Sequence, residues 1–502
     1  MEERNKRLAY NTFSSLLFQV ATVVCGFILP RLILSSYGSD VNGLVNSISQ
    51  FLGVISFLEL GVGAVVQSSL YKPLADNDEA QISRIIRSAN RFFRTIAAML
   101  LFYVIILVLF YPRFTKQTFD YAYTATLIVA MSLSSFAQYY FGIVNRILLT
   151  ADQRGYIQCN AQTASVILNT LSCFILIRAG ASIQIVKLTT SLIFLLQPFV
   201  IYLYVRRHYS IDHRITYIEE PIGQKWNGIA QHVAAVVLEG TDIVILTLFD
   251  SLVSVSIYSV YYLVVNGVKQ LFQSLTNGVQ SLMGDLWARG EKERLSELFD
   301  WTEWLIHTGT VFLFGVTAIA IVPFVEVYTF GVNDADYRQP LFAALLVAAH
   351  AGHCLRLPYN ILILAAGHYR ETQSNYIVAA VMNVVISILA VSRFGLIGVA
   401  VGTLAAMFYQ TVWMAVYDSR HLMNRPMRKF FRQLSVDILT VAVMVLSTWK
   451  IEMQDVSYRA WIVYAFLVSM ISIGVIVLVN ILFYRERMKK TWKTLAGLVF
   501  RR

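Results

Sequence analysis

The chain has 502 residues, of which 57% are hydrophobic and only 14% are charged, and its formal net charge is +11. Soluble proteins are nearer a quarter charged, so this composition excludes an ordinary soluble domain and indicates an integral membrane protein. The positive charge does not indicate nucleic-acid binding, because no soluble scaffold remains on which a basic surface could be built.

Long apolar stretches follow one another along the whole chain. A helix that crosses a membrane needs about 20 mostly apolar residues. Fourteen stretches meet this requirement, and they predict an all-α integral membrane protein. They cover residues 11–34, 43–66, 92–111, 120–147, 157–177, 183–205, 228–249, 255–283, 304–330, 340–365, 374–392, 395–417, 431–449 and 460–483.

Lysine and arginine are concentrated on one side of these predicted spans. With the N-terminus inside, about 30 of the 41 basic residues fall in the two tails and the even-numbered loops, against about 8 on the opposite face. Basic loops stay in the cytoplasm, so both termini are predicted to be cytoplasmic. Clusters on that side, such as the one that contains Arg425, are expected to bind anionic headgroups of the inner leaflet.

The chain also resembles itself weakly. Segments 74–86 and 287–299 both follow a span on the cytoplasmic side and lie 213 residues apart, and Asn145 aligns with Asn360 at an interval of 215. Two repeats of six spans would enter the membrane in the same direction, as parallel repeats do. We therefore predict three parts: a six-helix bundle in 1–210, a second in 211–420, and two further helices with a basic cytoplasmic tail in 421–502.

Charged side chains within the predicted spans are the first candidate site residues. His350, His353 and Arg356 lie at i, i+3 and i+6 of one span, and Lys269 lies midway along another. A charge at such depth costs about 2.5 to 3.5 kcal/mol unless it faces the bundle or water. We predict that these residues line a hydrated cavity. The alternatives are pairing of the two cations with a membrane acid, and neutral histidines bonded to neighbouring helices.

Acidic residues form the second candidate group. Glu239 and Asp242 lie at i and i+3, so they share a helix face, and Glu59 lies in the second predicted span. Two carboxylates held close together share a proton or bind a cation, which predicts coupling to protons or sodium. The alternatives are ion pairs with Lys269 or Arg356, and an ordinary buried acid at Glu59.

Catalytic and metal-binding motifs are absent from the sequence. The four cysteines lie in predicted spans without CxxC spacing, and His350 and His353 alone are too few ligands for a metal site. No Gly-rich phosphate loop, GxSxG or HExxH occurs. We expect neither an enzyme nor a cofactor.

One segment resembles a known family. Residues 29–75, beginning "LPRLILSSYGSDVNGL", are similar to the first two spans of Wzx-type flippases, with an arginine, a Tyr-Gly turn and a Gly-rich "ELGVGAVV". These flippases are the polysaccharide transporter family of the multidrug, oligosaccharidyl-lipid and polysaccharide exporter (MOP) superfamily. Fourteen spans match the family over the whole chain, and sister families of drug exporters and lipid II flippases share the layout.

The resemblance implies a MATE-like fold and a function. Such a protein moves undecaprenyl-diphosphate-linked oligosaccharide from the cytoplasmic to the outer leaflet of a bacterial inner membrane, by alternating access through a cavity between its halves. The product supplies O-antigen, capsule or exopolysaccharide, and association with polysaccharide assembly proteins would be expected. The matched segment includes Arg31. Snorkelling to headgroups would satisfy this side chain, but Pro30 can bend the helix and direct it inward, so we predict an outer-cavity cation.

Two other functions remain as alternatives. A drug or small-cation exporter of the same fold would need an acid-rich or apolar cavity, which the mid-span cations disfavour. A membrane polysaccharide polymerase or glycosyltransferase usually carries a large outer loop, and every predicted outer loop here is short.

Overall fold

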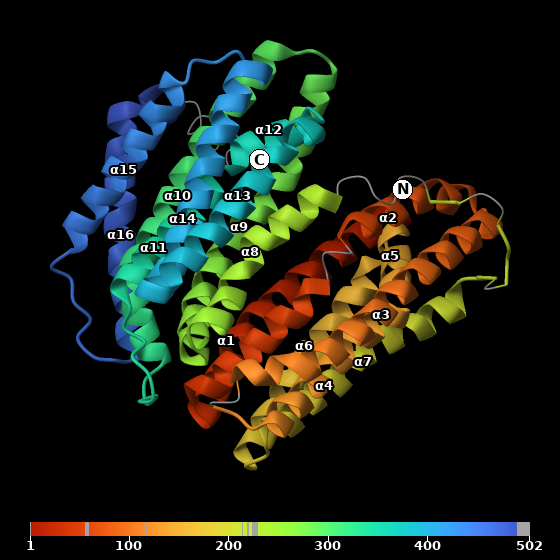
Figure 1. The fold of residues 1–502 in the computed structure, drawn as a ribbon. Helices are drawn as coiled ribbons and strands as arrows, with labels where there is room; N and C mark the ends of the chain where they lie inside the picture. The colour runs from red at the N-terminus through yellow and green to blue at the C-terminus, as the bar shows by residue number, and fades with distance from the viewer. Residues whose placement is uncertain are drawn as a thin grey trace. The chain divides into compact units, whose positions relative to one another are not determined.

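The computed structural model describes residues 2–55, 60–115, 118–212, 214–217, 220–222 and 229–488. These residues form helices joined by short connections, which confirms the expected all-α fold. The helices in chain order (Figure 1) are α1 (Glu2–Gly53), α2 (Leu60–Asp76), α3 (Glu79–Thr115), α4 (Tyr121–Ala137), the π-helix η2 (Gln138–Gly142), α5 (Ile143–Ala151), α6 (Gly155–Arg178), α7 (Ile183–His208), α8 (Ile229–Phe249), α9 (Leu252–Ala288), α10 (Lys292–Tyr328), α11 (Pro340–Leu355), α12 (Leu357–Ala365), α13 (Tyr369–Phe394), α14 (Leu396–Tyr417), the π-helix η3 (Asp418–Leu422), α15 (Arg428–Thr448) and α16 (Tyr458–Phe483).

Twelve helices in the described residues are long and apolar enough to cross a membrane, where the sequence predicted fourteen spans. The two differences fall on the predicted spans 43–66 and 228–249. The first is divided between the end of α1 and the 17-residue α2. In the second, the apolar portion of α8 is the shorter segment Gly240–Phe249.

A sharp bend divides α1. Gly38 has φ 84° and ψ 178°, so the first two predicted spans meet there without the loop that was expected at 35–42. Glycine adopts this conformation without the clash that a Cβ would cause. The Tyr37 hydroxyl donates to the Ala181 carbonyl at 2.6 Å, which ties the bend to the connection between α6 and α7.

Helix boundaries recur at a constant interval. Both α3 and α10 are 37 residues long, and they begin 213 residues apart. Residues with positive φ in the connections recur as well. Asn77 and Gly290 are 213 residues apart, Gln153 and Gly367 are 214 apart, and Gly180 and Gly395 are 215 apart. An internal duplication predicts such a pattern.

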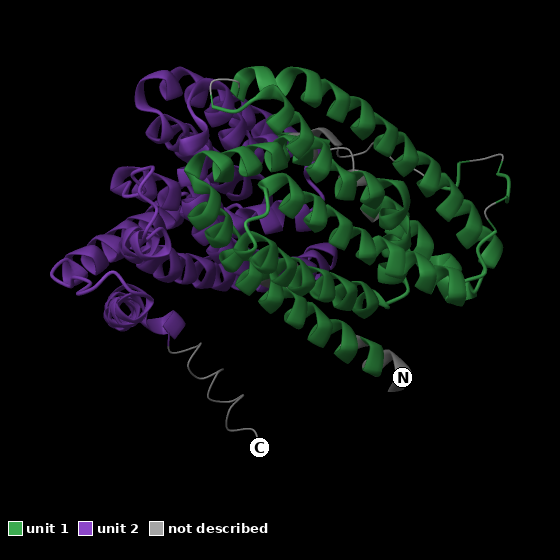
Figure 2. Ribbon diagram, turned by 90° about the horizontal axis from the view of Figure 1, so that it is seen from below, with its two compact units in different colours: residues 1–236 green, residues 237–502 purple. Residues whose placement is uncertain are grey.

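The chain divides into two compact units, Met1–Val236 and Val237–Arg502 (Figure 2). In unit 1, α1 packs against α6, and α7 packs against both α4 and α6. In unit 2, α14 packs against α11 and α13, while α10 packs against α9, α11 and α16. The predicted parts 1–210, 211–420 and 421–502 stay a prediction.

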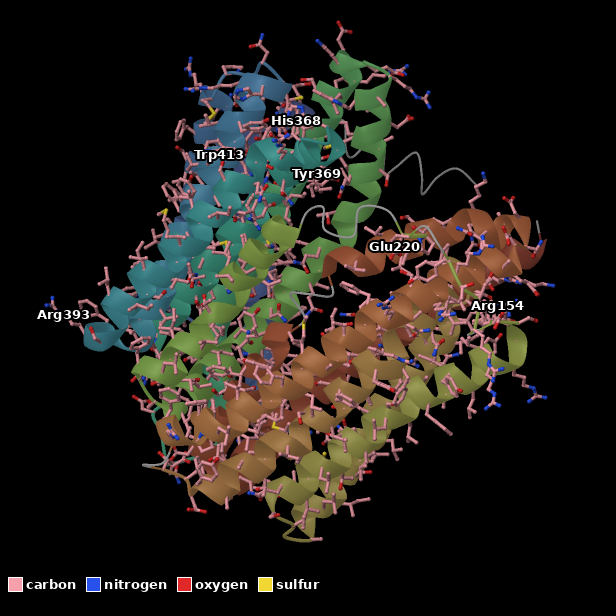
Figure 3. The ribbon with its side chains drawn as sticks, turned by 45° about the vertical axis from the view of Figure 1, so that its right-hand side comes forward. Arg154, Glu220, His368, Tyr369, Arg393 and Trp413 are labelled. Carbon is pink, nitrogen blue, oxygen red and sulfur yellow. The ribbon has the colours of Figure 1, made fainter. Side chains whose placement is uncertain are left out.

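Small residues set the close packing of α13 on α14. A Cβ at Gly402 would overlap the Ser387 hydroxyl and lie 2.9 Å from the Ser387 nitrogen. Small side chains at a helix crossing let two backbones approach within a membrane. Tyr369 and Arg393, labelled in Figure 3, stand in the first and last turns of α13 and give this apolar helix a polar residue at each end.

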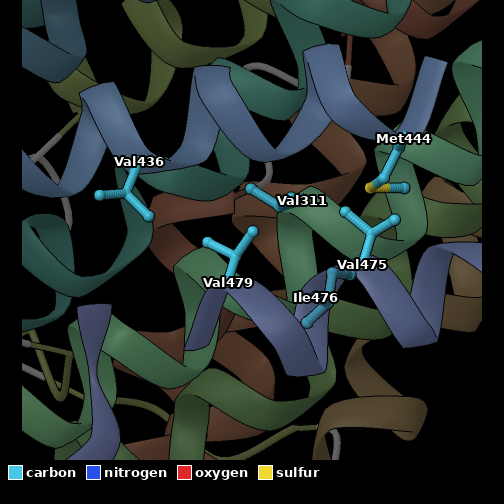
Figure 4. Close-up of a cluster of buried hydrophobic side chains, with 6 residues drawn as sticks. All are labelled: Val311, Val436, Met444, Val475, Ile476 and Val479. Atoms are coloured by element: carbon cyan, nitrogen blue, oxygen red, sulfur yellow. The ribbon is translucent and has the colours of Figure 1, made fainter. Parts of the chain in front are cut away.

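The last two helices are attached to α10. Val311 of α10 packs with Val436 and Met444 of α15 and with Val475 and Val479 of α16 (Figure 4). A buried polar contact reinforces this attachment, since His307 Nδ1 of α10 lies 2.6 Å from Asp437 Oδ2 of α15.

Candidate functional site

A buried cationic group lies inside unit 2. His350 and His353 stand on α11, and Arg356 follows at the junction of α11 with α12. Lys269 comes from α9, which packs against α11, and acts electrostatically on both histidines. All four side chains are buried, with Lys269 at 3% and Arg356 at 6% exposure. The structure thus brings together the four site residues that were predicted in the second half of the chain. The histidine spacing places His350 and His353 on one helix face.

Arg356 is held by neutral partners. Its Nη1 donates to Gln410 Oε1 of α14, and its Nη2 donates to His353 Nδ1 at 2.9 Å. Its guanidinium also lies 5.9 Å from the centre of the Tyr376 ring. A guanidinium has only donors, so His353 must accept at Nδ1 and carry its proton on Nε2. Within the described residues Arg356 forms no ion pair, and the predicted alternative of pairing with a membrane acid is not seen there.

Unused hydrogen-bond donors accumulate around this guanidinium. Arg356 Nε, His353 Nε2 and Gln410 Nε2 are buried without an acceptor among the described residues. His350 has no hydrogen bond at either ring nitrogen within the same residues, and its ring lies 5.5 Å from that of Tyr262. A buried donor without an acceptor costs about 1 to 3 kcal/mol. The group is therefore suited to a ligand that supplies acceptor oxygens and negative charge.

Asp242 occupies a different network. Its Oδ2 accepts from the Tyr258 hydroxyl of α9 and from the Thr403 hydroxyl of α14, each at 2.8 Å. Asn383 of α13 donates to the Thr403 oxygen at 3.1 Å. Asp242 Oδ1 is buried and has no partner in the described part of the chain. The carboxylate is thus bound by neutral groups rather than by Lys269 or Arg356, and it keeps one oxygen for a proton or a cation.

An apolar groove lies on another face of α11. It has a volume of about 580 Å³ and is bounded by α10, α11, α14 and α15. Ala348 and Leu355 of α11 line it together with Phe314, Phe408 and Val441. One helix therefore separates a cationic interior from an apolar groove.

A second charged cluster lies where α14 is connected to α15. The Arg425 guanidinium donates through both terminal nitrogens to Glu303 of α10, and Tyr359 donates to the same carboxylate at 2.7 Å. Asp300 accepts from Arg425 at 3.1 Å. Burial alone would lower the pKa of Arg425, but the hydrogen bonds and charge of Glu303 raise it above its ordinary value. Arg425 was expected to contact headgroups; instead its side chain is buried against a carboxylate.

The remaining predicted site residues are not brought into these clusters. Arg31 is half-buried on α1 of unit 1. Glu59 lies outside the described residues, and so does the side chain of Glu239. Sequence reasoning missed Gln410, Thr403 and Asn383. The available signal was their polarity within long apolar stretches, where a buried amide or hydroxyl needs a partner.

Solved structures with the same fold include a flippase and transporters. The lipid II flippase MurJ, in an inward closed conformation, gives a TM-score of 0.72 at 13% identity and covers 94% of this chain and 100% of that chain. An inward-facing multidrug resistance MATE family transporter of the MOP superfamily gives 0.63 at 13% identity, covering 80% and 94%. A eukaryotic MATE transporter gives 0.60 at 12% identity, covering 88% and 99%.

The sequence matches no protein-family model and no curated protein sequence. At these identities the structural comparisons establish the fold. The chain has the fold of the MOP superfamily.

Proposed function

We propose that the protein is a flippase that moves an undecaprenyl-diphosphate-linked oligosaccharide from the cytoplasmic to the outer leaflet of a bacterial inner membrane. The observation that carries this proposal is the surplus of buried donors around Arg356. A diphosphate offers several acceptor oxygens and at least two negative charges. Arginine can bind such oxygens with two hydrogen bonds, and Lys269 adds a compact positive charge nearby.

The apolar groove supports a lipid-linked rather than a free anion. A polyprenyl chain needs a continuous apolar surface, and each buried methylene contributes about 0.8 kcal/mol. The groove beside Ala348 and Leu355 offers that surface on the same helix that carries the cationic residues. Head and tail of one amphiphile would then be bound on two faces of α11.

The rest of the transport cycle belongs to the same proposal. Alternating access between two parallel six-helix halves would carry the head group, with Arg31 contributing from the first half when the outer side opens. Asp242, together with Glu239 and Glu59, would couple transport to protons or sodium. Both termini would lie in the cytoplasm, and the protein would associate with polysaccharide assembly proteins.

The fold alone is compatible with a drug or small-cation exporter, since MATE transporters share it. The cationic group is the observation that disfavours this alternative, because a cationic drug would be repelled by Lys269 and Arg356. A membrane enzyme is disfavoured because the neighbours in fold are a flippase and transporters.

Variants of Arg356 test the proposal. We expect Arg356→Ala to reduce delivery of surface polysaccharide in a complementation assay by about tenfold or more, since loss of a charge-assisted hydrogen bond costs about 1.5 to 3 kcal/mol. Arg356→Lys should retain part of the activity, and Arg356→Glu should be inactive at normal membrane abundance. Arg393→Ala, which removes an exposed arginine at the end of α13, is the matched control.

The result that contradicts the proposal is equally specific. A stably expressed Arg356→Glu variant that delivered polysaccharide at the rate of the unmodified protein would exclude an anionic head-group site around this residue. Loss of the Ala variant from the membrane would assign Arg356 a structural role instead.

A further inference from the structure

Unit 1 contains a polar cavity that the cationic group of unit 2 does not explain. It has a volume of about 210 Å³ and lies between α7 and the continuous segment formed by α4, η2 and α5. We propose that this cavity binds a sugar ring of the transported glycan, an inference that rests on the proposed function and specifies where its carbohydrate part is recognised. The side chains that carry the argument are Ser134, Gln138, Arg146, Phe194 and Gln197.

The membrane setting makes this lining unusual. Both walls of the cavity belong to helices that are long and apolar enough to cross a membrane. Polar side chains in such segments are costly, and they mark substrate pathways more often than lipid-facing surfaces. Two glutamines, a serine and an arginine around one cavity therefore need a shared polar occupant.

Local breaks in helix geometry open the cavity. The helix between α4 and α5 widens into η2, where the Ile143 nitrogen donates to the Gln138 carbonyl five residues earlier. Such π-segments concentrate at functional sites. On the opposite wall, Pro198 cannot donate a hydrogen bond, so the Phe194 carbonyl loses its usual helical partner and becomes an acceptor at the cavity wall.

Close packing fixes the two walls against each other beside the cavity. A Cβ at Gly142 would lie 3.0 Å from Pro198 Cβ, so glycine is required for this approach of η2 to α7. Tyr140, in the same π-helix, receives the Arg94 guanidinium over its ring at 5.1 Å. The cavity is thus held open by packed backbone rather than by a flexible loop.

The lining fits a pyranose ring better than an inorganic anion. Each glutamine amide presents both a donor and an acceptor, which matches neighbouring hydroxyl groups of a sugar. Ser134 adds a hydroxyl, the Phe194 ring offers an apolar surface for the sugar's C–H face, and Arg146 can bind a carboxylate with its planar fork. This combination favours a hexose, with preference for a uronic acid.

Direct binding tests the proposal without relying on transport. Full-length protein in lipid nanodiscs, prepared without glycoside detergents, would be titrated with methyl glucuronide and methyl glucoside and followed by saturation-transfer NMR. We expect saturable binding of both, with Gln138→Leu and Gln197→Leu weakening it about tenfold. Arg146→Gln should weaken the glucuronide selectively. Gln158→Leu, a half-buried glutamine on α6 outside the cavity, is the matched control.

Every outcome distinguishes the two proposals. Absence of saturable binding, or equal weakening by Gln158→Leu and the cavity variants, overturns the sugar site even if Arg356 variants block transport. Saturable binding that the cavity variants weaken supports the site even if transport assays exclude a lipid-linked substrate. Ser134→Phe, which fills the cavity from another wall, must abolish binding while the melting temperature stays unchanged.

Discussion

At the scale of single residues, Asp242 shows how a buried carboxylate can be positioned without a counter-charge. Two hydroxyl groups fix one of its oxygens, and Asn383 orients one of those hydroxyls. The other oxygen remains unused within the described residues. A carboxylate bound only by neutral donors can change its protonation state without breaking an ion pair.

This arrangement leads to a prediction for transport. Asp242→Asn keeps the shape of the side chain but removes the charge, so we expect gradient-driven export to be lost while membrane abundance stays normal. Export would be measured in vesicles with and without an imposed proton or sodium gradient. Transport that is equally fast in both conditions, for the unmodified protein and the variant, would make Asp242 a structural residue.

Glu303 and Arg425 lead to a prediction for stability. Glu303→Gln leaves a buried guanidinium without its carboxylate, and breaking a buried pair in this way costs about 3 to 5 kcal/mol. Unfolding in detergent should report this loss. Asp285→Asn removes an exposed pair with Arg289 and should change the unfolding free energy by only about 0 to 1 kcal/mol. Equal effects of the two variants would show that the pair around Arg425 contributes no more than a surface contact.

The residue scale also shows the reach of sequence reasoning. His350, His353 and Arg356 could be grouped from their spacing on one helix, and Lys269 could be added from its depth in a span. Partners contributed by distant helices, such as Gln410 for Arg356, could not be found, because helix packing rather than local periodicity brings them together. The reversal for Arg425 has the same cause, since its carboxylate partner stands 122 positions earlier.

At the scale of helices, hydropathy located the long spans but not their interruptions. The bend at Gly38 and the division between α1 and α2 depend on backbone conformations that an apolar stretch does not encode. The π-helix at Gln138–Gly142 likewise lies inside a stretch that the sequence presents as one uninterrupted span.

The crossing of α13 and α14 gives a prediction at this scale. Gly402→Ala introduces a methyl group where the Ser387 side chain and backbone already lie, so overpacking should lower stability by about 1 to 3 kcal/mol. It should also weaken gradient coupling, because Thr403 is the next residue. Gly474→Ala, which meets no atom within 4 Å, should be neutral or slightly stabilising. Thermal unfolding of the two variants side by side would decide, and equal melting temperatures would refute the packing argument.

At the scale of the whole molecule, the repeated helix boundaries and the charge bias together fix an expected topology. The pairs α3 and α10 would both run outward from cytoplasmic connections. An impermeant thiol reagent applied from outside to a cysteine-free background should label a cysteine at Asn333 and spare one at Lys292, both of which are exposed positions. The reverse labelling pattern would invert the protein in the membrane and reverse the proposed direction of transport.

The two-sided character of α11 has a consequence for how such a protein can diversify. Its cationic face and its groove face are supplied by different residues of the same helix, His353 on one and Ala348 on the other. Substitutions on the groove face would adjust the length of isoprenoid chain that is accepted, while the head-group contacts stay intact. Lineages could therefore change their carrier lipid and their head-group chemistry in separate evolutionary steps.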